Sequence, residues 1–213
     1  MIQSATGIIL RTRPLTDTSL IVNWLTPAQG RVSTAAKGAR GNKSPFRGKL
    51  DLFYEADFSY SPSRRSDLHT LREVSLLETH APLRQELHYL QQVSYAAALI
   101  EQTTEKETPL PAIFELMRQF LVALPQRPPQ PRSIFAFELK LLGELGLNPD
   151  LTQTRLSAGL KQVIETLVEC NWPEIFLLKP TAAQANELRQ FLHGFLIFHL
   201  GKIPKQRAAA IHN

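Results

Sequence analysis

Hydrophobic and polar positions alternate along the first part of the chain with the period of two that is typical of β-strands. The alternation is clearest from Leu52 to Tyr60, where an apolar or aromatic residue occupies every second position. Turn-forming residues separate the alternating runs. The pattern predicts five short strands, within residues 8–13, 19–25, 31–37, 52–60 and 68–77. Five short antiparallel strands in about eighty residues favour a small closed barrel, of which the OB-fold is one form.

After Pro82 the apolar residues recur every three to four positions, which indicates amphipathic helices. Such stripes occupy residues 83–100, 113–124, 134–145 and 156–167. A last helix is expected to begin at Thr181, which forms a T-x-x-Q capping box with Gln184, and to end near Gly201. The proline-rich stretch 125–131 cannot be helical and is expected to space two helices.

The predicted architecture is therefore α+β (β then all-α). We expect an OB-fold nucleic-acid-binding domain at residues 1–80 and a helical bundle domain at residues 81–213. The net charge is +5 and the isoelectric point is near 9.5. The first eighty residues carry eleven basic and seven acidic side chains, and the remainder carries thirteen and twelve. The excess positive charge thus lies in the strand-rich part and suggests an acidic binding partner.

Sequence motifs of catalysis are missing. The six histidines do not form an H-E-x-x-H motif, and there is no G-x-S-x-G nucleophile elbow. The segment around Gly41 resembles a phosphate-binding loop, but Asn42 stands where that motif needs a glycine directly before the lysine. Cys170 is the single cysteine, so neither an internal disulfide nor a thiolate zinc site is expected. We predict no enzymatic activity, no metal, no cofactor and no membrane span, and a cytoplasmic, nucleoid-associated location.

The most informative segment is the cationic stretch 37–49, whose glycines and proline predict a loop between the third and fourth strands. Its cations can neutralise several adjacent phosphates of a nucleic acid, and strand alternation adds arginines on neighbouring strands. The predicted phosphate-contacting residues are Arg11, Arg13, Arg31, Lys37, Arg40, Lys43, Arg47 and Lys49. Phe46 and Phe53 are candidates for stacking on bases. A solvated basic loop without a ligand is the alternative.

Several segments resemble the RecO family of recombination mediators. They are the strand-rich pieces 7–20, 25–32, 36–40 (A-K-G-A-R), 47–53 and 70–78, and the helical pieces 137–146 and 199–207. The resemblance implies an OB-fold followed by a helical domain, binding of single- and double-stranded DNA, and annealing of complementary strands. It also implies action with RecR and with the C-terminal tail of single-strand binding protein, helping RecA to load on DNA coated with that protein.

Two points qualify the resemblance. Many relatives carry a four-cysteine zinc module after the helix at 137–146, whereas residues 147–157 are few and contain no cysteine, so the module is expected to be deleted. The acidic, Phe-ending tail of single-strand binding protein would need an apolar cleft with cations nearby. Arg118 and Arg132 lie near apolar helix faces and are the candidates, although ordinary helix-surface arginines would look the same.

Two other classes of function stay open from the sequence. The barrel could be an adaptor whose basic loop binds an acidic protein partner; such an adaptor has no reason to prefer longer oligonucleotides. An enzyme that acts on nucleic acid is disfavoured by the missing nucleophile or metal motif.

Overall fold

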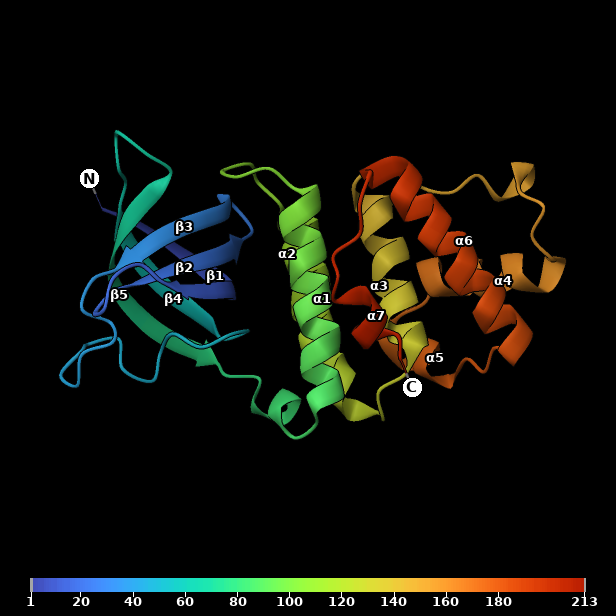
Figure 1. Ribbon diagram of the computed structural model, residues 1–213, viewed down its shortest axis with the longest axis horizontal. Coiled ribbons are helices and arrows are strands. Elements are labelled where there is room, and N and C mark those ends of the chain that lie inside the picture. The colour runs from blue at the N-terminus through green and yellow to red at the C-terminus, as the bar shows by residue number, and fades with distance from the viewer. Residues whose placement is uncertain (1, 213) are drawn as a thin grey trace. The chain divides into compact units, whose positions relative to one another are not determined.

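A computed structural model, which describes residues 2–212, contains a closed five-stranded barrel with the strand order β1-β2-β3-β5-β4 (Figure 1). The strands are β1 (Gln3–Pro14), β2 (Leu20–Thr26), β3 (Gly30–Ala36), β4 (Glu55–Ser61) and β5 (Leu68–Glu78). The barrel confirms the predicted OB-fold. One expectation was wrong: the strands are not all antiparallel, because β3 and β5 pair in parallel and so close the barrel.

Strand β1 pairs with its two neighbours over different halves of its length. Its first half pairs with β4 and its second half with β2, and the register shifts between Ile9 and Arg11. At this bend Ile8, Ile9 and Leu10 are all buried, which breaks the simple alternation of inward and outward residues. Trp24 fills the barrel centre: its ring stacks on Phe58 with centroids 4.0 Å apart. The indole is therefore part of the core.

Helices follow the barrel. They are α1 (Leu87–Thr103), α2 (Pro111–Ala123), α3 (Pro131–Glu144), α4 (Ala158–Glu169), α5 (Trp172–Leu177), α6 (Ala182–Leu200) and α7 (Arg207–Ala210), with short 3-10 turns at Ala81–Arg84, Leu124–Gln126 and Leu151–Gln153. The predicted capping box of Thr181 and Gln184 is present at the start of α6, and Gly201 ends that helix with φ 71°.

The chain forms two compact units that interleave along the sequence. One contains the residues up to Pro82 together with Thr104–Arg118, and the other contains Leu83–Thr103 together with the residues from Gln119 on. The second unit has an aromatic core in which Phe120 lies 4.9 Å from Phe137, measured between ring centroids. Residues 104–118 pack with the barrel although they follow it in the sequence. The division into domains 1–80 and 81–213 therefore stays a prediction.

Residues 104–108, called the strap from here on, lie against β3. The amide of Glu107 donates to the carbonyl of Arg31 at 3.1 Å, and Lys106 forms an isolated parallel bridge with Arg31. Gly30, with φ +63°, lies so close to the strap that a Cβ atom on it would be 1.8 Å from the Thr108 carbonyl oxygen. The strap thus continues the barrel surface where β3 extends beyond β5.

Candidate nucleic-acid interface

Residues 37–49, called the basic loop from here on, connect β3 to β4 and carry most of the predicted cations. The side chains of Lys37, Arg40, Lys43 and Arg47 are exposed, and none of them forms an ion pair within residues 2–212. Arg40 donates to the carbonyl of Thr16 at 3.4 Å, and Arg47 donates to the carbonyl of Asn42 at 3.3 Å. The four charges are therefore available to an anionic ligand.

The inner side of the basic loop is anchored to the barrel. Phe46 is buried in the barrel core, and the ammonium of Lys49 donates to the carbonyl of Val74 at 3.1 Å. After the loop, the amide of Phe53 donates to the carbonyl of Ile9 at 2.8 Å. These contacts fix the loop backbone, so its outward-pointing cations are held in a defined arrangement. Lys49 is half-buried and serves as an anchor in this structure.

Phe46 and Phe53 do not present their rings to solvent. Their exposed fractions are 6% and 1%, so the expectation that they stack on bases is wrong for this conformation. Phe46 packs into the barrel core, and Phe53 is buried where its amide is hydrogen-bonded to β1. Phe53 adopts φ 66°, in the left-handed region that favours glycine, just before β4 begins. Because Phe53 lies before β4, the alternation of inward and outward residues along that strand does not predict which way its ring points.

The three arginines predicted on the strands occupy two different environments. Arg11 and Arg13 are exposed on β1. The β1–β2 turn that follows them is tied to the basic loop, since the amide of Arg40 donates to the carbonyl of Thr18 at 2.9 Å. Arg31, in contrast, is half-buried and donates through Nη2 to the carbonyl of Thr104 in the strap. Of the three, Arg11 and Arg13 lie on the exposed surface and Arg31 is engaged in packing.

A hollow of about 390 Å³ is present between the basic loop and the start of β4. Arg40, Arg47 and the half-buried ring of Tyr54 line it, together with one acid, Asp51. The sequence pattern placed Tyr54 only within the fourth predicted strand, residues 52–60. No local pattern separates a ring that lines a surface hollow from one that is fully buried. An aromatic ring beside two guanidinium groups is an arrangement that suits a stacked base with its phosphates.

A larger hollow of about 870 Å³ is lined by residues of β1, β4 and β5. Its lining includes the cations Lys49 and Arg72 and the acids Asp57 and Glu73, so its charge is mixed. Asp57 accepts a hydrogen bond from the hydroxyl of Thr6 at 2.5 Å. This surface therefore attracts a phosphate backbone less than the basic loop does.

The two arginines considered for a partner peptide differ in availability. Arg118 donates two hydrogen bonds to Glu115, at 2.8 and 2.9 Å, and these bonds together with the carboxylate charge raise the pKa of its guanidinium. Arg132 is half-buried and donates to the carbonyl of Phe176 at 2.8 Å, and burial lowers its pKa. Its buried Nε has no hydrogen-bond partner among the described residues. Arg132 thus retains an unused donor, whereas Arg118 is already paired.

The described residues 2–212 lack the side-chain cluster of a metal site and the apolar helix of a membrane span. This part of the chain holds no cluster of three or more His, Cys, Asp or Glu side chains that could bind a metal ion. Within it, no helix has the length and apolar character needed to cross a membrane. Residues 147–157, where the zinc module of the relatives was expected to be deleted, contain the 3-10 turn Leu151–Gln153.

Comparison with known proteins yields two family matches. Residues 1–80 match the model of the family described as "Recombination protein O N terminal", and residues 84–157 match that of "Recombination protein O C terminal". The first match covers all five strands, and the second extends from the 3-10 turn after β5 to the residue that caps α4. Together the two matches cover the barrel unit almost completely and the second unit up to residue 157, so helices α4 to α7 lie outside them.

Individual relatives agree with the family matches. The chain is similar to the DNA repair protein RecO of Anaeromyxobacter sp. (strain K), with 34% identity over 146 residues, which are 68% of this chain and 58% of the relative. It is also similar to the proteins of that name from Bacillus pumilus (29% over 153 residues; 72% of this chain and 59% of the relative) and Bacillus subtilis (28% over 151 residues; 71% and 58%). The similarity thus spans somewhat more than half the length of these relatives.

Proposed function

The chain belongs to the RecO family, and we propose that it acts in DNA repair and recombination as a mediator without catalytic activity of its own. It would bind single- and double-stranded DNA through the barrel and promote the annealing of complementary strands. With RecR, it would help RecA to load on DNA coated by single-strand binding protein, at the bacterial nucleoid.

The observation that carries this proposal is the set of unpaired cations on the basic loop. Lys37, Arg40, Lys43 and Arg47 are exposed on a loop whose backbone is anchored to the barrel by Phe46. Each phosphate that such a cation neutralises releases condensed counterions, which favours binding. Because these contacts address the backbone and not the base edges, binding is expected to tolerate changes of sequence. Arg11 and Arg13 would extend the same path along β1, and Lys49 would support it from beneath. Arg31, held by the strap at the start of β3, would contribute from the other end of that strand.

The tail of single-strand binding protein is proposed to bind the helical part of the chain. Arg132 is the better of the two candidates, since its Nε is buried with no hydrogen-bond partner in residues 2–212 and the neighbouring Leu177 is 68% exposed. An arginine beside an exposed apolar side chain suits a peptide that ends in phenylalanine and a carboxylate.

The proposal is tested by fluorescence anisotropy of a labelled single-stranded oligonucleotide, titrated with the chain at several salt concentrations. We expect the logarithm of the affinity to fall linearly with the logarithm of the salt concentration, and to change little with base sequence. No binding at low salt would refute DNA binding and would favour the adaptor that takes an acidic protein partner.

Charge reversal within the basic loop is expected to weaken that binding. The double variant Arg40→Glu/Lys43→Glu should lower the affinity and reduce the salt slope by about 1.4, at about 0.7 per lost phosphate contact on a single strand. The matched control is Arg155→Glu/Arg189→Glu, which reverses two exposed arginines of the helical unit. An unchanged slope in the loop variant, or an equal loss in the control, would count against this loop as the contact surface.

Removal of the Tyr54 ring is expected to weaken binding in a way that salt does not explain. Tyr54→Ala should cost about 1–3 kcal/mol of binding free energy, the range for loss of one stacked base, with the salt slope unchanged. Tyr54→Phe keeps the ring and should bind as the unmodified chain does. Equal affinities of all three proteins would show that no base stacks in this hollow.

A further inference from the structure

The loop between β4 and β5, residues 62–67, carries two cations that the sequence analysis did not select. Arg64 and Arg65 are both exposed, and neither side chain forms a hydrogen bond or an ion pair within the described residues. The one acid of the loop, Asp67, is bound by the ammonium of Lys106 at 3.2 Å. The loop therefore presents two unpaired guanidinium groups, and its one acid forms an exposed ion pair with a lysine of the strap.

The backbone of this loop is held in a fixed shape. The amide of Ser63 donates to Nδ1 of His69 at 3.2 Å, and the amide of Arg65 donates to the hydroxyl of Ser63 at 3.2 Å. The hydroxyls of Ser63 and Ser66 lie 3.3 Å apart and share a hydrogen bond. Because these bonds restrict the loop backbone, less backbone entropy is lost when its arginines bind.

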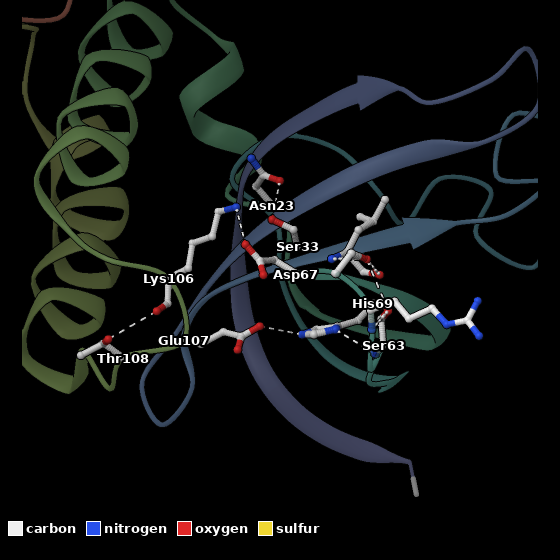
Figure 2. Close-up of polar contacts among 11 residues, drawn as sticks. Asn23, Ser33, Ser63, Asp67, His69, Lys106, Glu107 and Thr108 are labelled. Atoms are coloured by element: carbon white, nitrogen blue, oxygen red, sulfur yellow. Dashed lines mark hydrogen bonds and ion pairs between the residues drawn. The ribbon is translucent and has the colours of Figure 1, made fainter.

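His69 connects the loop to the strap (Figure 2). Its ring is buried and stacks on Tyr60 with centroids 5.1 Å apart. Since the amide of Ser63 can only donate, Nδ1 of the imidazole is the acceptor and Nε2 carries the hydrogen, which it donates to Glu107 at 3.0 Å. The strap thus positions the loop at two points, through Glu107 on His69 and through Lys106 on Asp67.

The loop and the basic loop lie at opposite ends of the barrel. The basic loop precedes β4, which begins at Glu55, and the β4–β5 loop follows the other end of that strand at Ser61, so the length of β4 separates the two loops. Figure 1 shows the same separation, with the β4–β5 loop at the top of the barrel and the basic loop at its lower end. One barrel therefore presents two separate groups of unpaired cations.

We propose that Arg64 and Arg65 form a second phosphate-binding site, which holds a second segment of DNA while the basic loop holds the first. The inference rests on the proposed DNA binding. A guanidinium group suits a phosphate because its donors can bind two of the phosphate oxygens at once. The loop between the fourth and fifth strands is also one of those that OB-folds use for oligonucleotides. Two sites on one barrel would keep two strands near each other, which is the physical requirement for annealing.

The test follows the binding of two short, non-complementary oligonucleotides of about six nucleotides, which is near the lower end of OB-fold site sizes. One carries a donor dye and the other an acceptor dye, so energy transfer reports their simultaneous binding. We expect the unmodified chain to bind both. Arg64→Ala/Arg65→Ala should keep the first binding step and weaken the second, with the salt slope of the second step reduced by about 1.4. Arg155→Ala/Arg189→Ala is the control of equal charge loss.

The outcomes separate this inference from the proposed function. If the unmodified chain binds no oligonucleotide at low salt, DNA binding itself fails. If it binds only one, or if the Arg64→Ala/Arg65→Ala variant binds both as tightly as the unmodified chain, DNA binding stands and the second site is refuted. If that variant weakens the first step as much as the second, both loops contact one strand and the second-segment inference is wrong.

A second pair of variants tests whether the strap positions the loop. Glu107→Gln removes the negative charge and keeps an oxygen that accepts from Nε2 of His69, whereas Glu107→Ala removes both. Because both variants lose the same charge, their difference isolates the hydrogen bond. We expect the second binding step to be weaker in Glu107→Ala than in Glu107→Gln. Equal affinities would show that Glu107 has no positioning role.

Discussion

Replacement of Arg207 by alanine is expected to lower the free energy of unfolding of the helical unit by about 3–5 kcal/mol. The guanidinium of Arg207 on α7 donates to both carboxylate oxygens of Glu138 on α3, at 2.6 and 3.0 Å. The hydroxyl of Tyr95 on α1 donates to the same carboxylate at 2.5 Å. Glu138 is 0% exposed and Arg207 is 5% exposed, so the variant would leave a buried carboxylate without its countercharge.

The Tyr95 hydroxyl cannot replace that countercharge. Burial and the charge of Glu138 raise the pKa of Tyr95 well above its ordinary value, so the hydroxyl stays neutral and contributes one hydrogen bond only. The loss should be visible in a urea titration followed by the helical circular-dichroism signal. Because the C-terminal helix α7 reaches the helical core through this ion pair, it should also become more susceptible to proteolysis in the variant.

Two control variants separate the loss of a buried countercharge from the loss of any ion pair. Arg118→Ala breaks an exposed ion pair with Glu115 in the barrel unit and should lower the free energy of unfolding of that unit by only about 0.2–1 kcal/mol. The double variant Glu138→Leu/Arg207→Met removes both buried charges together and should regain most of the lost stability. If Arg207→Ala costs no more than Arg118→Ala, the pair is not a buried ion pair in solution.

The sequence predicted those elements of the fold that carry their own local signal. The capping box at Thr181 and the left-handed Gly201 delimit α6 as expected, because both signals lie within one helical turn of the ends. The first half of β1, residues 3–7, has no apolar alternation and becomes a strand only by pairing with β4. The short helices α5 and α7 were not predicted, since fewer than two full turns give no apolar period.

The sequence predicted the positive charge of the basic loop, but not which of its side chains face solvent and which face the barrel. The cations of residues 37–47 are exposed as expected, because a charged side chain in a glycine-containing loop has little reason to be buried. Which loop residues face the barrel depends on packing beyond the loop itself. Phe46 and Lys49 therefore became anchors. Arg31 is engaged by the strap, which lies more than seventy residues away along the chain, and no local pattern could reveal that contact.

The second large loss of stability is expected when Gly30, which lies against the strap, is replaced by alanine. A Cβ atom on this residue would lie 1.8 Å from the carbonyl oxygen of Thr108 and 2.7 Å from its carbon, and both are backbone atoms that no rotamer change can move. Gly30→Ala must therefore displace the strap or the β2–β3 turn. With the added cost of a non-glycine residue at φ +63°, we expect a loss of about 2–5 kcal/mol in the stability of the barrel unit.

Gly38 provides a matched control for this substitution. Its φ is +68°, nearly that of Gly30, but nothing lies within 4 Å of a Cβ atom built on it. Gly38→Ala should therefore cost only the conformational part, about 1–2 kcal/mol, so the difference between the two variants measures the contact with the strap. Both are compared by denaturant unfolding followed by tryptophan fluorescence in a Trp172→Phe background, so that the signal comes from Trp24 in the barrel core. Equal losses would mean that the strap leaves β3 in solution. A larger loss in Gly30→Ala would establish that residues 104–108 are a structural part of the barrel, as the positioning of Arg64 and Arg65 requires.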